Sequence, residues 1–462
     1  RHNPLSDTLL ANSFQFLTLG ASASVPWSQD RSSNITYQHR VDFLPLSDGF
    51  NRQTIADQLA LENTLKLNAR NNLVVNIQYR KLNIVLPGNN LNSGENYLVR
   101  VQHNYQAPKG NITNALSYEI GSGQEQKIDF YYQEVKAGDG QYEYNDYNND
   151  GVKQLDEFEL AVNIENAKYV RLVLLSNEFV RTNNIEINEN LLLSFPEGWS
   201  KREVWRKLLQ KFSINNAGQI SRKLKSANFE QVWNAFSEFN EENQLALLNY
   251  YYNNVLYFNR GKSDYEIQLG INGNTTKQLL SSGLEGRYLQ EYFHYARFSL
   301  SKAWILEYKI TSSVSGSEAQ LFKSRSFRIN SFKTEPGISW NVTRNARFSL
   351  KSKFERSKDT DVDNPADLQL FQGVLEGKIN TNEKSSIVSK FTFSEVSFNG
   401  NVSSPSGFSL LQGLRNGNNF QWNLEIDYRL TKKMYLNGGY EGRKLGDGKV
   451  IHVLRMQVKA EF

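Results

Sequence analysis

The segment of this chain with the clearest chemical potential is a run of short oxygen-bearing side chains that ends in a glutamate, residues 146–157. Counted as a calcium-binding loop, it places carboxylate or amide oxygens at the first, third, fifth and twelfth positions, and Gly151 at the sixth, where such a loop turns sharply. Hard oxygen ligands at these spacings suit Ca²⁺, with a backbone carbonyl at the seventh position. The candidate metal ligands are Asp146, Asn148, Asp150, Val152 through its carbonyl, and Glu157.

The same loop departs from a paired helix–loop–helix calcium sensor. Lys153 occupies the eighth position, where a paired loop has an aliphatic residue, and no helical pattern flanks the segment cleanly. We therefore expect a single structural calcium loop between strands, which rigidifies an external loop, with Gln154 coordinating directly or through water. The alternative is an Asn/Asp/Gly-rich turn that holds no metal.

No constellation with catalytic spacing accompanies this loop. The five histidines are scattered, and the sequence contains no G-x-S-x-G elbow, H-E-x-x-H pair or G-x-x-x-x-G-K-[ST] loop. The 462 residues include no cysteine, which excludes disulfides, thiolate metal sites and cysteine nucleophiles. We predict that the chain is not an enzyme and that it binds no organic cofactor.

The charges of the chain nearly balance. Lysine and arginine number 53 against 48 aspartates and glutamates, which gives a formal net charge of +5, and no long run has one sign. Nucleic acid is therefore not a predicted partner. The absence of cysteine also fits an envelope compartment, where free thiols would be oxidised.

The elements that must hold such a loop are indicated by the last residues, 451–462, in which apolar and polar side chains alternate. One side of this segment is apolar and the other is charged, as in a strand with two different faces. The apolar side contains His452, Leu454, Met456, Val458, Ala460 and Phe462, and the charged side contains Arg455, Gln457, Lys459 and Glu461. In a membrane barrel the first side would meet lipid and the second would line the lumen.

This pattern recurs in segments of about ten residues, the length of a tilted strand that crosses a bilayer. The mean hydropathy of −0.57 does not contradict it, because polar and apolar residues cancel along such strands. We predict an all-β antiparallel transmembrane β-barrel, to which this chain contributes about fourteen to eighteen strand candidates. These strands close the barrel alone or with strands from an upstream segment. A soluble all-β stack is the alternative, but its outer sheet would be unusually charged. The clearest segments are 35–43, 73–80, 97–105, 265–271, 347–355 and 420–430.

The connections between these segments alternate in length, as in outer-membrane barrels, where short turns lie on the periplasmic side and long loops lie outside. Short turns are predicted at residues 343–345, 381–384 and 431–433. Long external loops are predicted at residues 357–367 and 399–418.

Two stretches break the strand pattern. Residues 200–212 place Val204 and Leu208 at helical spacing beside a basic face, which predicts a short amphipathic helix on the barrel wall or on an anionic membrane surface. Residues 229–249 predict a long loop with some helix. The expected organisation is strands with the calcium-type loop in 1–195, a helical and loop insertion in 196–250, and carboxy-terminal barrel strands in 251–462.

The amino terminus shows no signal peptide, because residues 1–6 are polar and no apolar stretch with a cleavage site follows them. Strand-like sequence begins almost at once, at residues 13–20. We therefore expect the chain to be the carboxy-terminal part of something larger.

Several short motifs, spread over nearly the whole chain, carry a family resemblance. They are ALSYEIGSGQ at 115–124, AGDGQY at 137–142, DYNNDG at 146–151, FEL at 158–160, the strand 169–181, LYFNR at 256–260, and YEGR with the terminal strand at 440–458. Together they resemble the carboxy-terminal portion of very large outer-membrane β-barrel proteins of the Bacteroidetes. The resemblance implies a Gram-negative outer membrane and residues upstream. A more distant similarity in style is to the giant barrel of the type 9 secretion translocon.

Three classes of function remain open on these observations. The first is a non-enzymatic component of an outer-membrane complex for translocation, assembly or surface attachment, with lipoproteins or secretion components as partners besides the outer-membrane lipids. The second is an outer-membrane channel or nutrient uptake transporter. The third, a barrel enzyme, is the least favoured because no nucleophile or base cluster emerges.

Overall fold

The computed structural model describes most of the chain. The described residues are 13–46, 49–86, 93–195, 203–225, 232–236, 244–262, 264–280, 283–320, 323–360, 365–381, 384–431 and 433–460. Residues 200–202 of the predicted helix, and Glu461 and Phe462 of the terminal strand, lie outside these ranges.

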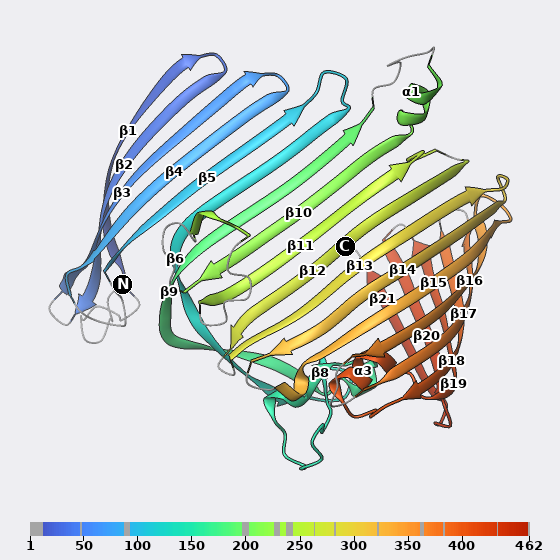
Figure 1. Ribbon diagram of the computed structural model, residues 1–462. Helices are drawn as coiled ribbons and strands as arrows, with labels where there is room; N and C mark the ends of the chain where they lie inside the picture. The colour runs from blue at the N-terminus through green and yellow to red at the C-terminus, as the bar shows by residue number, and fades with distance from the viewer. Residues whose placement is uncertain are drawn as a thin grey trace.

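Strands dominate the described part of the chain (Figure 1). The first half contains β1 (Gln15–Ser28), β2 (Arg31–Leu46), β3 (Gly49–Asn68), β4 (Asn71–Ile84), β5 (Gly94–Gln106), β6 (Ile112–Glu134), β7 (Tyr142–Tyr144), β8 (Phe158–Leu160), β9 (Tyr169–Ser194) and β10 (Phe212–Leu224). The second half contains β11 (Leu245–Phe258), β12 (Tyr265–Leu280), β13 (Gly283–Ser299), β14 (Trp304–Ala319), β15 (Phe327–Asn341), β16 (Ala346–Asp359), β17 (Asp367–Thr381), β18 (Ser385–Asn399), β19 (Gly417–Thr431), β20 (Met434–Leu445) and β21 (Ile451–Ala460).

All these strands belong to one antiparallel sheet, which confirms the predicted fold class. Each long strand pairs with the next along the chain, except that β6 pairs with β9 across the intervening β7 and β8. β7 and β8 have three residues each, so nineteen of the 21 strands are long. The sequence estimate of fourteen to eighteen was too low.

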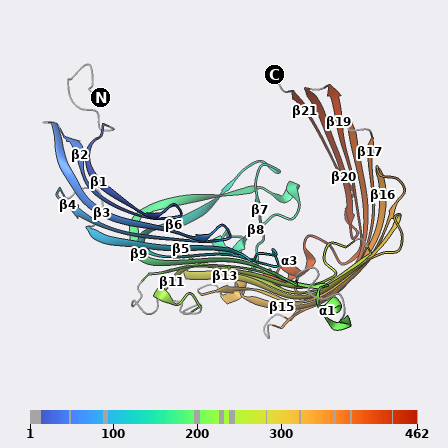
Figure 2. The same ribbon diagram turned by 90° about the horizontal axis from the view of Figure 1, so that it is seen from above.

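The sheet curves into a deep U when seen from above (Figure 2). Its convex side is apolar: Leu350, Leu375 and Phe391 are paired neighbours on β16, β17 and β18, and they remain 51%, 54% and 44% exposed. The concave side carries charge, with Lys333 of β15 and Glu355 of β16 only 3.6 Å apart. Away from this pair, the concave side of β17 and β18 also holds a buried apolar cluster that includes Leu368, Leu370, Val396, Phe398, Leu410 and Leu411. The strand periodicity therefore places exposed apolar residues on the outside of the curve, and charged residues and this buried cluster on the inside.

The two ends of the sheet are open in the described part of the chain. β1 pairs only with β2, and β21 pairs only with β20. The closed wall that the sequence analysis expected is therefore not completed by these strands, and Figure 2 shows the two edges at the two tips of the U.

The non-strand elements are few and short. They include α1 (Val204–Leu209), α3 (Pro405–Leu411) and the 3₁₀ turns η1 (Leu155–Glu157), η2 (Ile164–Asn166) and η3 (Lys323–Arg325), and residues 232–233 are also helical. None of the described helices is long and apolar enough to span a membrane. α1 falls within the predicted helix at 200–212, but it is shorter, and Phe212 already begins β10.

Two sequence predictions need correction. The expected helical and loop insertion at 196–250 contains all of β10 and the start of β11. The sequence obscured β10 because Asn216 and Gly218 occupy positions on its apolar side. The predicted loop at 399–418 contains α3, whose Ser404 caps the helix by accepting a hydrogen bond from the Gly407 amide at 3.0 Å.

The assignment of the convex side to lipid can be tested on adjacent residues of β17. Leu375→Arg places a charge on the convex side and should destabilise the membrane-inserted sheet by about 2–4 kcal/mol, the cost of a cation near the bilayer midplane. Urea unfolding of the protein refolded into phospholipid vesicles measures this. The control is Glu376→Arg, on the concave side, which should cost far less; equal costs would contradict the assignment.

Candidate functional site

Residues 135–168 form a small domain, here called the insert, between β6 and β9. It contains β7, η1, β8 and η2, and it lies inside the curve of the sheet (Figure 2). Its centre is aromatic: Phe158 is only 5% exposed and stacks on Tyr132 with ring centroids 4.1 Å apart. Tyr169 meets the same Phe158 ring edge-on at 4.9 Å. The insert therefore has its own packed core, which begins on the ends of β6 and β9.

The predicted calcium loop occupies one end of this insert, between β7 and β8. Asp146, Asp150 and Glu157 each offer a carboxylate oxygen, and these oxygens all lie within 4.8 Å of one another. One oxygen of Asp146, Oδ1, is buried without a hydrogen-bond partner, and Glu157 is only 1% exposed. A buried carboxylate oxygen without a partner is costly, and a cation would satisfy it. The residues present therefore fit a divalent ion with hard oxygen ligands.

The backbone of the loop turns as the sequence spacing requires. Gly151 adopts a φ of 73°, in the left-handed region, and its amide donates to Oδ2 of Asp146 at 3.0 Å. The Asp150 amide donates to Oδ1 of Asn148 at 2.9 Å. The first bond closes the chain around the carboxylate of Asp146, and Asn149 (φ 59°) and Gly151 both supply the left-handed conformation that the turn needs.

The remaining predicted ligands have other partners in this structure. The carbonyl of Val152 accepts a hydrogen bond from the Tyr144 hydroxyl at 3.4 Å. Gln154 donates through its side-chain amide to Asp150 at 2.7 Å, and its backbone amide donates to Glu157 at 3.1 Å. The structure thus gathers the three predicted carboxylates and places Asn148 beside Asp150. Calcium binding itself stays a prediction.

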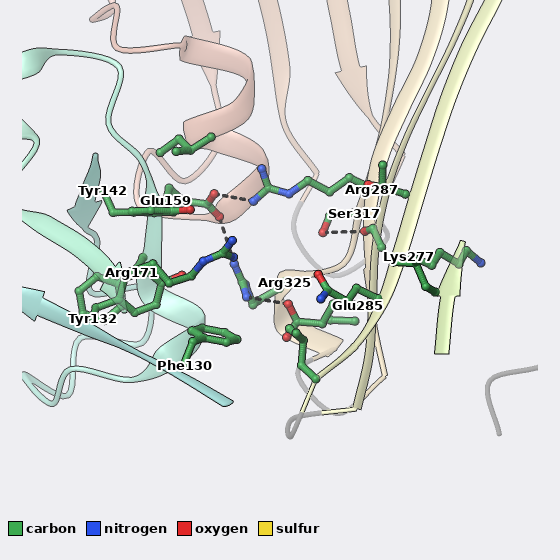
Figure 3. A pocket seen from close by; sticks show the side chains of 18 of the residues that line it. Phe130, Tyr132, Tyr142, Glu159, Arg171, Lys277, Glu285, Arg287, Ser317 and Arg325 are labelled. Carbon is green, nitrogen blue, oxygen red and sulfur yellow. Dashed lines mark hydrogen bonds and ion pairs between the residues drawn. The ribbon is translucent and has the colours of Figure 1, made fainter. Parts of the chain in front are cut away.

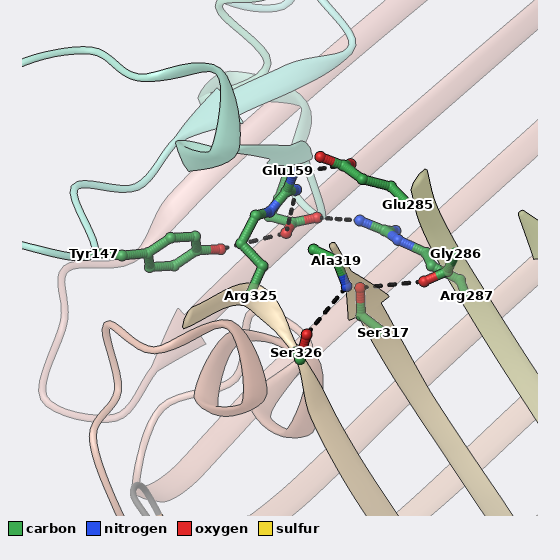
Figure 4. Close-up of polar contacts among 9 residues, drawn as sticks. All are labelled: Tyr147, Glu159, Glu285, Gly286, Arg287, Ser317, Ala319, Arg325 and Ser326. Atoms are coloured by element: carbon green, nitrogen blue, oxygen red, sulfur yellow. Dashed lines mark hydrogen bonds and ion pairs between the residues drawn. The ribbon is translucent and has the colours of Figure 1, made fainter. Parts of the chain in front are cut away.

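A cluster of charged side chains joins the insert to the wall (Figure 4). Glu159 of β8 accepts from Arg287 of β13 at 2.7 Å and from Arg325 of η3 at 3.5 Å. Arg325 also donates to Glu285 at 3.3 Å. The side chains of Glu159 and Arg325 are only 10% and 13% exposed, so this pair is shielded from solvent.

Tyr147 links this ion cluster to the calcium loop. Its hydroxyl donates to Glu159 at 3.5 Å, and its backbone amide donates to Glu157 at 3.3 Å. Burial, followed by the nearby negative charge of Glu159, raises the pKa of the Tyr147 hydroxyl well above its usual value. The hydroxyl therefore remains a donor, and one residue ties the loop to the anchoring carboxylate.

The insert also touches the wall further along the sheet. Glu165 of η2 lies against Arg443 of β20. Val162 lies so close to Gly413, just after α3, that a Cβ added to this glycine would come within 2.8 Å of it. The insert therefore bridges segments of the wall that lie far apart in the sequence.

Sequence reasoning found the loop but missed its anchors. Glu159 lies within the motif at 158–160, yet its partners are 128 and 166 positions away along the chain. Arg287 and Arg325 lie at the end of a strand and in a turn, where a basic residue is ordinary. No local signal could have paired them.

Comparison with known proteins finds likeness only among solved structures. No protein-family model and no curated protein matches this sequence. The ferric-catecholate import receptor Fiu from E. coli K12 aligns over 96% of this chain and 72% of its own, with 9% identity and a TM-score of 0.37. The siderophore receptor PirA from Acinetobacter baumannii aligns over 98% and 71%, with 10% identity and a TM-score of 0.36. A bacterial polysaccharide outer membrane secretin aligns over 76% and 88%, with 7% identity and a TM-score of 0.28.

Calcium binding can be tested by removing one carboxylate. Glu157→Gln removes the charge at the twelfth position and should weaken Ca²⁺ binding about tenfold or more, since that residue supplies two oxygens in loops of this type. Terbium luminescence, sensitised by Tyr144 and Tyr147, reports the affinity. Asp139→Asn, in an exposed turn of the same insert, should leave the affinity unchanged. No terbium signal in the unmodified protein would show that the loop is a metal-free turn.

The ion cluster predicts that two Glu→Gln substitutions destabilise the insert by different amounts. Glu159→Gln removes the charge that Arg287 and Arg325 share, and leaves the nearly buried Arg325 paired with Glu285 alone. It should destabilise the docked insert by about 3 kcal/mol, the low end for a broken buried pair, because Glu285 still pairs with Arg325 and Arg287 is 59% exposed. Glu134→Gln breaks a solvent-exposed pair with Lys153, and should cost less than about 1 kcal/mol. Hydrogen exchange of the amides of β7 and β8 measures both. Equal protection in the two variants would mean that the cluster does not anchor the insert.

Proposed function

We propose that this chain is a wall of an outer-membrane β-barrel that serves as a non-enzymatic component of a protein complex for translocation, assembly or surface attachment. The observation that carries this is the single sheet of nineteen long antiparallel strands, apolar on its convex side and charged on its concave side. In lipid, backbone amides and carbonyls have no water to bind, so a polypeptide crosses the membrane either as helices or as paired strands that form a closed barrel. The resemblance of the sequence motifs to large outer-membrane barrels of the Bacteroidetes supports the location.

The size of the sheet favours a complex over a simple pore. Barrels of 16–18 strands already leave an aqueous channel, and 22-stranded transporters have a plugged lumen. Here nineteen long strands form only the open U of Figure 2, so any barrel that they complete has a wide lumen. A wide lumen suits the passage or holding of a folded partner better than the selection of a small solute.

The position of the insert supports a lumen whose mouth is narrowed by a folded domain. The insert, η3 and α3 all follow strands that end on the same side of the sheet, the side with the longer connections. Connections on the other side include the short turns between β15 and β16 and between β17 and β18, as the sequence predicted. By the usual asymmetry of such barrels, the insert lies at the external mouth. It would narrow that mouth and present a surface to partners.

The alternative is an outer-membrane channel or nutrient uptake transporter. One observation favours it: a folded domain held inside the curve by ion pairs occupies the place of a plug. A barrel blocked in this way needs displacement of the insert for transport, whereas a complex component can keep it fixed.

The two functions are separated by gentle detergent extraction from the native outer membrane, followed by mass spectrometry of the proteins that co-purify. We expect partners at stoichiometric amounts, among them lipoproteins or secretion and assembly components. A lone barrel that conducts ions in planar bilayers would overturn this proposal in favour of the channel. The Glu159→Gln variant sharpens the second measurement, because release of the insert should then raise the conductance.

A further inference from the structure

A half-enclosed hollow of about 300 Å³ lies between the insert and the wall (Figure 3). On the insert side it is lined by aromatic rings of β6, β7 and β8, and on the wall side by residues of β11 to β14. Its charged lining includes three arginines and two glutamates: Arg171, Arg287, Arg325, Glu159 and Glu285. The hollow therefore combines a flat apolar surface with a concentration of charge.

The charges of this hollow do not cancel. Arg287 and Arg325 share the two carboxylates of Glu159 and Glu285 through three ion pairs. Arg171 forms no ion pair with any carboxylate of the described residues. Lys277 also borders the hollow, but it pairs with Glu318 at 3.0 Å. Among the described residues, the Arg171 guanidinium on β9 is thus the one cation of the hollow without a carboxylate partner.

Aromatic rings hold this guanidinium in place. Its central carbon lies 5.4 Å from the ring centre of Phe130 and 5.8 Å from that of Tyr142. Attraction between a cation and aromatic faces orients the side chain without neutralising its charge. In Figure 3 the Arg171 side chain points toward the centre of the hollow, beside Arg325. The site is therefore organised for an anion before any anion arrives.

The composition of the lining defines the ligand. One excess positive charge suits a ligand with one negative charge, whereas a dianion would leave the hollow negative. Leu247 and Leu280 of the wall line the hollow together with the aromatic rings, so part of the ligand has apolar surroundings. A planar guanidinium binds a carboxylate through two parallel hydrogen bonds. A carboxylate attached to an apolar or aromatic group combines the single charge, the planar shape and the apolar part that these features favour.

We propose that the hollow between the insert and the wall binds an amphiphilic monocarboxylate. Arg171 pairs with the carboxylate, and the apolar group packs on the side of the hollow that Phe130 and Tyr142 line. Such a group occurs both in a free aromatic acid and in the carboxy-terminal residue of a polypeptide. The site goes beyond the role proposed for the barrel, because neither complex assembly nor solute passage requires it.

The test uses the purified chain in detergent micelles and isothermal titration with three probes. They are N-acetyl-phenylalanine, its uncharged carboxamide, and a short peptide that ends in phenylalanine with a free carboxylate. We expect the acid to bind at least about tenfold more tightly than the amide, the difference that one guanidinium–carboxylate pair of about 1.4 kcal/mol makes. Tighter binding of the peptide than of the free acid would identify a polypeptide end as the ligand, and the reverse would identify a small acid.

Two arginine variants complete the test. Arg171→Gln should remove the preference for the acid over the amide. Arg260→Gln should preserve it, since Arg260 likewise stacks on a tyrosine, 4.5 Å from the ring of Tyr257, but lies in a turn away from the hollow. Equal binding of acid and amide by the unmodified protein overturns the proposal whether or not the variants fold. So does a preference that survives in a folded Arg171→Gln protein.

Discussion

The structure depends on one constraint, the need of every backbone amide and carbonyl within lipid for a partner on a neighbouring strand. The long strands between β1 and β21 meet it by pairing on both sides, whereas the outer edges of β1 and β21 have no partner strand among the described residues. The same constraint sets the side-chain pattern, because a strand embedded in this way shows alternate residues to lipid and to the interior. The calcium-type loop, α3 and η3 lie in the connections between strands.

The insert shows how such a wall can carry a compact domain. Extension of β6 and β9 beyond the ordinary strand length brings Tyr132 and Tyr169 to the base of the insert, where Phe158 completes an aromatic core. Charges then fix its position, since Glu159 meets arginines of the wall on the concave side. The polar interior that the barrel pattern requires thus also provides the anchors for the insert.

The alternation of side chains along strands also explains which elements could be predicted from the sequence and which could not. β19 and β21 were recognisable because each alternates over ten residues or more, and a regular period of two is a local signal. β10 was missed where polar residues occupy its lipid side, and α3 was missed although Ser404 and Pro405 form an ordinary helix start. The carboxylates at 146, 150 and 157 follow from spacing alone. The arginines that meet Glu159 depend on strand register, which no short window contains.

The open edges have a geometric consequence of their own. Strand direction reverses at each step from β1 to β21 through nineteen long strands, an odd number, so the two edge strands point the same way. If β1 and β21 met directly, the seam would be a parallel ladder in an otherwise antiparallel wall. A fully antiparallel ring requires an odd number of strands between them. The same parity holds for a ring of identical copies, in which every junction of β21 with a neighbouring β1 would again be parallel.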